Sequence, residues 1–240
     1  MKSQRRHELQ TNTLAQKLEG LPGFWQQHGN KVLIAIIVAA LGYFLVRYRM
    51  NTAQARLQTS RENLALARNA VNELVGYGFL RFPPEQAAHM RKEAIRNAST
   101  AIDTVKAETD EPVLRAEVLA TEGDLNWAIA HLAELPGATT QPSLRVDQDR
   151  AKCLTSAEQA YQAVLSQYPD QQLSVVTALF GLAAIAEDHS DWASAQSYYQ
   201  RVGDNPSIRK TYKDMARMRL AVLEQARIPL YIGQPAPPAT

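Results

Sequence analysis

The chain has 240 residues, of which 45% are hydrophobic and 21% are charged. This length allows a compact domain of about 100–200 residues together with appended segments, and the composition is too apolar for a disordered tail. The formal net charge of +2 gives no clustered basic excess, which argues against nucleic acid as a partner. The single cysteine, Cys153, excludes an internal disulfide and a multi-cysteine metal site.

The first predicted element is a transmembrane helix over residues 32–48, preceded by a basic tail over residues 1–31. Its core is the uncharged run VLIAIIVAALGYFLV from Val32 to Val46, which Lys31 and Arg47 close. A helical span needs about 17–25 residues, a length that the run reaches when the flanking basic side chains extend toward the interface. The alternative is a buried core helix, for which an apolar run this short would be ordinary; it is disfavoured because this run is apolar on every face, whereas the later helices are amphipathic.

The residues around the run argue against a cleaved signal peptide and for a cytoplasmic N-terminus. Ala40-Leu41-Gly42 resembles a processing site, but the 31 residues before the run are too many for an n-region, and Arg47 follows directly. Five basic residues precede the span and four follow it within residues 47–61, so the positive-inside rule decides little. A short basic tail stays inside more easily than a large domain does, so we expect the N-terminus to be cytoplasmic.

A stalk helix over residues 49–76 is predicted to continue from the span. Its apolar residues recur at alternating spacings of four and three, which places them on one seam: Ala53, Leu57, Ser60, Leu64, Ala67, Val71 and Leu74. The simpler interpretation is that this seam packs onto the domain that follows. The alternative is a parallel homodimer through a short coiled coil, which Ser60 and the two alanines would weaken.

The remainder is predicted to be a helical domain over residues 84–228 and a proline-rich tail over residues 229–240. Gly76, Gly78 and Pro83-Pro84 interrupt the stalk, and a second helix begins after the prolines and ends at about Glu108. The buried face of this helix is predicted to hold Ala87, Met90, Ala94, Ala98, Ala101, Ile102 and Val105. No segment alternates with period two over the length of a strand, so the chain is predicted to be all-α.

Two stretches in the C-terminal half share the spacing of tetratricopeptide repeats, which are helix-turn-helix units of about 34 residues. In the first stretch, the second helix of a repeat and its terminating proline are represented by Ala157, Tyr161, Val164 and Pro169. In the next, one helix carries Leu179, Leu182, Ala183 and Ala186, and the other carries Trp192, Ala195, Tyr199 and Val202. The pattern predicts stacked helical hairpins, an α-solenoid.

The units at either end of this pattern are less regular. Ala116 and Leu119 indicate an earlier half-repeat, in which Gly123 is predicted to make the turn. An insertion over residues 131–149 separates it from its partner helix. A final helix from Tyr212 to Ala226 is predicted to cap the stack.

The layout of basic tail, membrane helix and tetratricopeptide-like helices, with the motif Ala216-Arg217-Met218-Arg219-Leu220-Ala221, resembles bacterial single-pass membrane proteins similar to the ancillary subunit of the Sec translocon. The resemblance covers roughly Lys31 to Arg227. It implies an inner-membrane location, a periplasmic helical domain, and translocon subunits, chaperones or newly exported chains as partners. The insertion and the proline-rich tail depart from the family pattern, so the family's partner-binding residues are not transferred to this chain.

The sequence contains no recognisable constellation for catalysis or metal binding. The histidines are scattered, and none stands at metal-ligand spacing from an acid or a cysteine: His7, His28, His89, His131 and His189. Asp147 and Asp149 precede a helix and are predicted to cap its amide groups. Cys153 follows near the start of that helix, where a thiol pKa can fall, although an inert buried thiol is the commoner case. We therefore expect no catalytic residue, no metal, no cofactor and no enzymatic activity.

In a helical solenoid, the first helices of successive units line a concave groove that can hold a peptide or a partner helix. The repeat register predicts that this groove is lined by Thr177, Phe180, Ala184, Glu187 and Asp188. The competing interpretation is that Phe180 and Ala184 pack against the stalk helix, which would fill the groove in cis.

The sequence as a whole predicts a non-catalytic protein-interaction module, a scaffold or chaperone adaptor held in the lipid bilayer by residues 32–48. The alternative function is a structural component of the cell envelope that self-associates through the stalk helix.

Overall fold

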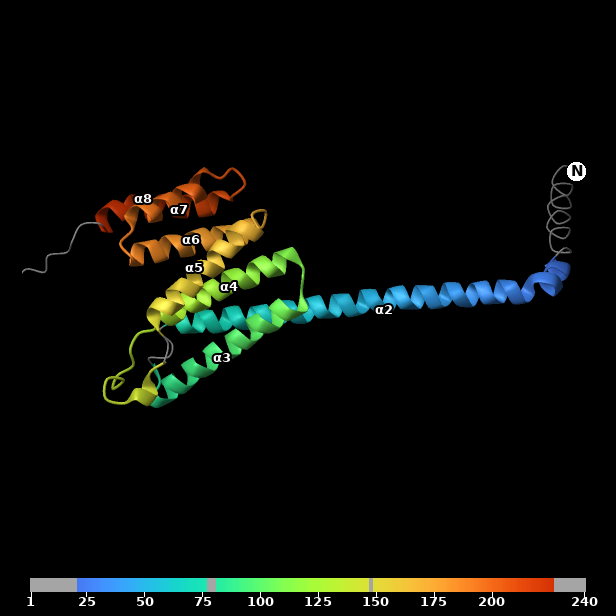
Figure 1. Ribbon diagram of the computed structural model, residues 1–240, viewed down its shortest axis with the longest axis horizontal. Helices are drawn as coiled ribbons and strands as arrows, with labels where there is room; N and C mark the ends of the chain where they lie inside the picture. The colour runs from blue at the N-terminus through green and yellow to red at the C-terminus, as the bar shows by residue number, and fades with distance from the viewer. Residues whose placement is uncertain (1–20, 77–80, 147–148, 227–240) are drawn as a thin grey trace, which may run out of the picture. The chain divides into compact units, whose positions relative to one another are not determined.

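The computed structural model describes residues 21–76, 81–146 and 149–226, and within these ranges it consists of helices and their connections, with no strand (Figure 1). The all-α prediction is therefore confirmed for the described chain. Residues 1–20 of the predicted basic tail, the whole predicted proline-rich tail and Asp147 lie outside the described residues. The chain divides into two units, residues 1–55 and residues 56–240.

Helix α2, Leu21–Val75, contains both the predicted span and the predicted stalk. In the first unit its large apolar side chains are exposed, among them Leu33, Ile34, Ile36, Ile37, Val38, Leu41, Phe44, Leu45 and Val46. From Gly29 onward, α2 is long and apolar enough to cross a membrane, and it is the one such helix in the described part of the chain. None of its most apolar stretch is buried, so this stretch is not the core helix of a folded domain.

The C-terminal part of α2 packs into the second unit, beside α3, Pro84–Glu108, and α4, Pro112–Ala130 (Figure 1). The seam residues that are buried in this shared core are Leu64, Ala67, Val71 and Leu74. Arg68 of α2 also forms an ion pair with Glu117 of α4 at 3.1 Å. A seam that is buried inside the chain is not open to a second copy, so the structure favours packing in cis over the coiled-coil dimer.

Helix α3 begins and ends where its flanking residues require. Pro84 occupies the first turn, where its missing N–H costs no hydrogen bond, and Thr109 ends the helix in an extended conformation. The predicted buried face is confirmed, except that Met90 is only half-buried. The sequence did not indicate that Arg91 is also buried here, where its Nη1 donates to the carbonyl oxygen of Ala133 at 2.7 Å.

Residues 131–146 of the predicted insertion are folded onto α3. It contains a short 3-10 helix, η2, Pro142–Leu144, and Lys92 of α3 donates from Nζ to the carbonyl oxygen of Ser143 at 2.7 Å. Leu135, Ala138 and Leu144 are buried in the core that α2, α3 and α4 share. The insertion therefore belongs to the packed domain and is not a loose excursion from it.

Four further helices follow, each packed on its predecessor: α5, Arg150–Gln167; α6, Gln172–Asp188; α7, Trp192–Asp204; and α8, Lys210–Ala226. Helix α4 also contacts α6. Most residues predicted to lie at the helix crossings are buried, namely Ala157, Tyr161, Val164, Leu179, Leu182, Ala183, Ala186, Ala195, Tyr199 and Val202. Two of the short loops between these helices contain prolines of the predicted pattern, Pro169 and Pro206, which cannot continue a helix.

The predicted turn at Gly123 is wrong, because α4 continues to Ala130. A Cβ added to Gly123 would lie only 2.4 Å from Cε1 of Tyr161 on α5. Gly123 therefore allows α4 and α5 to pack closely and does not make a turn. Glycine is favoured both in turns and at close helix contacts, so the sequence pattern alone did not distinguish the two roles.

Candidate functional site

The five residues predicted to line a groove all lie on α6, but their surroundings differ. Thr177 and Ala184 are half-buried, and the Thr177 hydroxyl donates to the carbonyl oxygen of Leu173 at 3.2 Å. The half-buried ring of Phe180 packs against Tyr199 of α7, with ring centroids 5.7 Å apart. Phe180 contacts the core of the later helices, which is separate from the core that contains α2.

Glu187 is engaged within the domain by the same tyrosine. The Tyr199 hydroxyl donates to Oε1 of Glu187 at 2.7 Å. Burial, followed by this hydrogen bond, raises the pKa of Tyr199 above its usual range. The tyrosine therefore keeps its proton and ties the last turn of α6 to α7, so Glu187 has a structural partner already.

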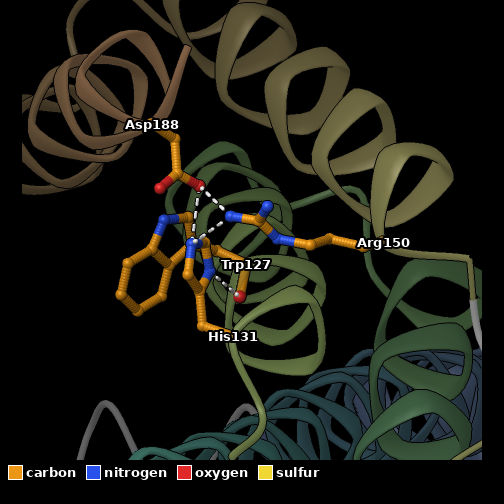
Figure 2. Close-up of polar contacts among 4 residues, drawn as sticks. All are labelled: Trp127, His131, Arg150 and Asp188. Carbon is orange, nitrogen blue, oxygen red and sulfur yellow. Dashed lines mark hydrogen bonds and ion pairs between the residues drawn. The ribbon is translucent and has the colours of Figure 1, made fainter. Parts of the chain in front are cut away.

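Asp188 is the last residue of α6 and meets two basic side chains from other helices (Figure 2). Its Oδ2 lies 2.6 Å from Nε2 of His131, the residue that ends α4, and accepts from an Nη of Arg150, the first residue of α5, at 3.1 Å. The Asp188 and His131 side chains are 24% and 25% exposed, whereas Arg150 is 60% exposed. We call Trp127, His131, Arg150 and Asp188 the α6-end cluster, because together they join the ends of α4, α5 and α6.

Both ring nitrogens of His131 have polar contacts in this arrangement. Nδ1 lies 2.8 Å from the carbonyl oxygen of Trp127, and Nε2 lies 2.6 Å from the Asp188 carboxylate. Nη2 of Arg150 lies 3.5 Å from the same Nε2. Both ring nitrogens of His131 therefore have contacts within the domain, and the ring links the end of α4 to the end of α6.

Trp127 completes the cluster by stacking on His131, with ring centroids 4.2 Å apart and planes inclined at 27° (Figure 2). Its indole Nε1 is buried and has no hydrogen-bond partner among the described residues. The stack holds the imidazole ring of His131 against the face of the indole.

Tyr161 of α5 forms a further polar contact between helices. Its ring lies between Gly123 of α4 and Gly181 of α6, where added Cβ atoms would approach ring atoms to 2.4 and 2.3 Å. The Tyr161 hydroxyl donates to Oδ1 of Asp124 at 2.7 Å. Burial raises the pKa of Asp124, and burial together with the Asp124 carboxylate raises the pKa of Tyr161 well above its usual value.

The start of α5 bears on two expectations from the sequence. Asp149 caps the helix as predicted, accepting from the backbone N–H groups of Ala151 and Lys152. The possible fall in the pKa of Cys153 is not found: burial, and then the charge of Asp149, raises the pKa of this thiol. Cys153 is 6% exposed, which fits the inert thiol that was the commoner expectation.

The described residues include no group of three or more histidines, cysteines or carboxylates that could hold a metal ion. A cavity of about 270 Å³ lies near the α6-end cluster and is lined by Leu74, Val75, Gly76, Arg91, Trp127, Ala128, His131 and Ala133. His131 contributes to this lining, but both of its nitrogens are already engaged. The described lining includes the Arg91 guanidinium and no carboxylate.

Sequence analysis found Asp188 but missed what it contacts. His131 is 57 positions away in the chain, and neither residue stands in a motif that would connect them. The same holds for Asp124 and Tyr161, which are 37 positions apart. A repeat register predicts which residues face a neighbouring helix, but the polar partner across a helix crossing depends on side-chain positions that the register does not contain.

Comparison of the chain with family models, with curated proteins and with solved structures finds no match.

Proposed function

We propose that this chain is a membrane-anchored protein–protein interaction module with no catalytic role. The observation that carries the proposal is the apolar stretch of α2, whose large side chains are exposed throughout in a chain that also has a well-packed helical domain. An exposed apolar surface of this extent needs a nonaqueous environment, because monomeric soluble proteins rarely expose contiguous patches above a few hundred Å². A lipid bilayer around residues 32–48 supplies that environment.

The contacts of the domain support binding in preference to catalysis. Three pairs of ionisable side chains form polar contacts that join helices: Tyr161 with Asp124, Tyr199 with Glu187, and His131 with Asp188. Each of these groups therefore has a structural partner within the domain. The successive packing of α4 to α8 supports the proposal, because tetratricopeptide-like stacks build their protein-binding surfaces from helices that pack on their neighbours.

Of the five predicted groove residues, Thr177, Phe180 and Ala184 stay proposed contacts for a partner. They lie on one helix and are half-buried, so each keeps some accessible surface. Glu187 and Asp188 have partners inside the domain, and we assign them to positioning the end of α6.

The proposed orientation has a cytoplasmic N-terminus and the helical domain in the periplasm. The resemblance in layout to the ancillary subunit of the Sec translocon makes translocon subunits, chaperones and exported chains the first partners to test. Protease added to spheroplasts, in which the inner membrane is sealed, should digest the helical domain. Protection of the domain until the membrane is permeabilised would reverse the orientation.

Photo-crosslinking in membranes tests the function itself. The full-length chain carrying Thr177→p-benzoylphenylalanine should capture discrete protein partners on irradiation. Gln159→p-benzoylphenylalanine, at an exposed position on α5, is the matched control and should capture fewer. Equal capture from Thr177 and Gln159 would contradict the proposed groove. If the domain formed no protein crosslink at all, the proposed function would be wrong.

A further inference from the structure

A second cavity, of about 260 Å³, lies between the start of α6 and the start of α8. Its lining consists of three apolar and three polar residues: Gln172, Leu173, Val176, Ile208, Arg209 and Tyr212. Val176 and Ile208 are 3% and 4% exposed, whereas Leu173 is 54% exposed. The apolar part of the lining therefore extends from the buried core to the surface at Leu173.

The polar side chains of this lining are not engaged by the described part of the chain. Gln172, Arg209 and Tyr212 form no side-chain hydrogen bond or ion pair with another described residue. Arg209 is exposed, and it is the one charged residue among those described in the lining. Asp170, the acidic residue closest to the lining in the chain, does not belong to the lining. The cavity therefore presents an apolar wall beside an unengaged guanidinium.

This lining is complementary to a group that carries a carboxylate next to an apolar side chain. A guanidinium can bind a carboxylate through two parallel hydrogen bonds, and the Tyr212 hydroxyl and the Gln172 amide can donate further ones. Gln171 does not cap α6 with its side chain, so the positive end of the helix dipole beside the cavity adds to the attraction. Small-molecule pockets usually measure roughly 300–1,000 Å³, so the cavity suits a single residue better than a larger ligand.

The cavity continues the proposed groove along α6. Leu173 lies one turn before Thr177, whose hydroxyl donates to its carbonyl oxygen. At 100° per residue, Leu173, Thr177, Phe180 and Ala184 fall within about 60° of the helix circumference. The helix rises about 16 Å from Leu173 to Ala184, which is the length of about five extended residues. A peptide on this face would have one end at the cavity.

We propose that the cavity binds the C-terminal residue of a partner polypeptide, an apolar residue such as leucine whose α-carboxylate pairs with Arg209. The proposal rests on the proposed function and deepens it, since it names the part of a partner that occupies this end of the groove. At a C-terminus the carboxylate and the apolar side chain are attached to the same carbon atom. An internal aspartate or glutamate supplies the charge but no apolar group for the cavity.

The test uses the full-length chain in nanodiscs of neutral lipid and fluorescently labelled peptides of about six residues that differ only at the C-terminus. The first ends in leucine with a free carboxylate, the second in leucine amide, and the third in serine with a free carboxylate. In fluorescence anisotropy the first should bind at least about ten-fold more tightly than either of the others. Equal binding of the three peptides, or no binding of the first, would overturn the proposal.

Variants of the chain assign the carboxylate contact to Arg209. Arg209→Gln should weaken binding of the leucine carboxylate peptide by about ten-fold and leave binding of the leucine amide unchanged, because the amide lacks the group that Arg209 binds. Arg96→Gln is the matched control, since Arg96 is an exposed arginine of α3 outside the lining, and it should bind all three peptides as the wild type does. An equal loss for both leucine peptides in Arg209→Gln would overturn the proposal.

Further arms of the experiment identify other occupants. 4-Methylpentanoate carries a similar apolar group and a carboxylate without a peptide; competition equal to that of the peptide would overturn the proposal in favour of a small apolar acid. Binding that appears only after removal of residues 227–240 would overturn it in favour of the chain's own tail. If the peptides fail while Thr177→p-benzoylphenylalanine still captures proteins, C-terminal docking is excluded and the proposed function stands.

Discussion

At the scale of single residues, the Tyr161 ring fits between α4 and α6 because Gly123 and Gly181 have no side chains there. We expect Gly181→Ala to destabilise the domain by about 1–3 kcal/mol, because its Cβ would lie 2.3 Å from the ring and overpacking forces side chains off their rotamers. Gly203→Ala on α7 is the control, since nothing lies within 4 Å of its added Cβ. Urea denaturation followed by circular dichroism measures both. Equal unfolding midpoints for the two variants would show that the helices yield to the added methyl group.

Ser60 of α2 is another residue whose fit can be tested. It is fully buried, and its hydroxyl oxygen has no hydrogen-bond partner among the described residues. A buried polar group without a partner costs stability, and alanine is the better helix former. We therefore expect Ser60→Ala to stabilise the domain by about 1 kcal/mol in the same denaturation assay. A lower unfolding midpoint would indicate that the hydroxyl does form a hydrogen bond.

The Asp124 carboxyl should make stability depend on pH. Burial raises its pKa from the ordinary value of 3.8, with the Tyr161 hydrogen bond and the charge of Arg68 opposing the shift. Between the ordinary and the raised pKa the folded state binds more protons than the unfolded state, so the free energy of unfolding falls as pH rises through that window. The stability of the wild type relative to Asp124→Asn should therefore decrease from acidic toward neutral pH. An increase over that range would show that the fold favours the carboxylate.

At the scale of helices, the α6-end cluster predicts unequal couplings between its members. His131 and Asp188 are both mostly shielded and 2.6 Å apart, whereas Arg150 is 60% exposed. A double-mutant cycle on His131→Ala and Asp188→Ala should give a coupling of about 0.5–3 kcal/mol. The Arg150→Ala and Asp188→Ala cycle should give about 0.2–1 kcal/mol, as is usual for exposed ion pairs.

The exposed pair Glu93 and Arg96 on α3, at 3.6 Å, provides the reference for these cycles and should show a coupling near the lower limit of exposed pairs. A His131–Asp188 coupling no larger than this reference would mean that the cluster does not hold the ends of α4, α5 and α6 together.

Helix positions could largely be predicted from local sequence, and their polar contacts could not. Pro84, Thr109 and the periodic alanines of α3 act within a few residues of their own helix, so propensity and capping rules place its ends. The burial of Arg91 depends on Ala133, 42 positions away. Gly123 shows the same limit in another form, because its role is set by Tyr161 on another helix and only the folded chain reveals it.

At the scale of the whole molecule, the membrane proposal predicts the behaviour of the full-length chain. It should stay in the membrane pellet after alkaline carbonate extraction. Ile36→Lys/Ile37→Lys should move it to the supernatant, because a lysine at the centre of a span costs about 2.5–3.5 kcal/mol. Leu66→Lys, at an exposed position in the second unit, should leave it in the pellet. A wild-type chain found in the supernatant would contradict the membrane proposal.

The sequence predicted the buried seam of α2, but it did not show which part of the structure packs on that seam. The spacing of Leu64, Val71 and Leu74 indicated one buried face, and these residues are buried. The same heptad-like spacing serves a dimer and an intramolecular contact alike. The choice follows from the packing of α3 and α4 on this face, and these helices lie later in the chain.

Labelling of Cys153, the single cysteine of the chain, can report on the opening of the second unit. Because Cys153 is 6% exposed and its burial raises the pKa of the thiol, a maleimide should modify it only when the surrounding helices separate. The labelling rate of the unmodified protein then measures how often that separation occurs, without the introduction of any probe. A ligand that binds elsewhere on the domain and stabilises the closed packing should slow the labelling. The labelling rate therefore detects binding even when the ligand has not been identified.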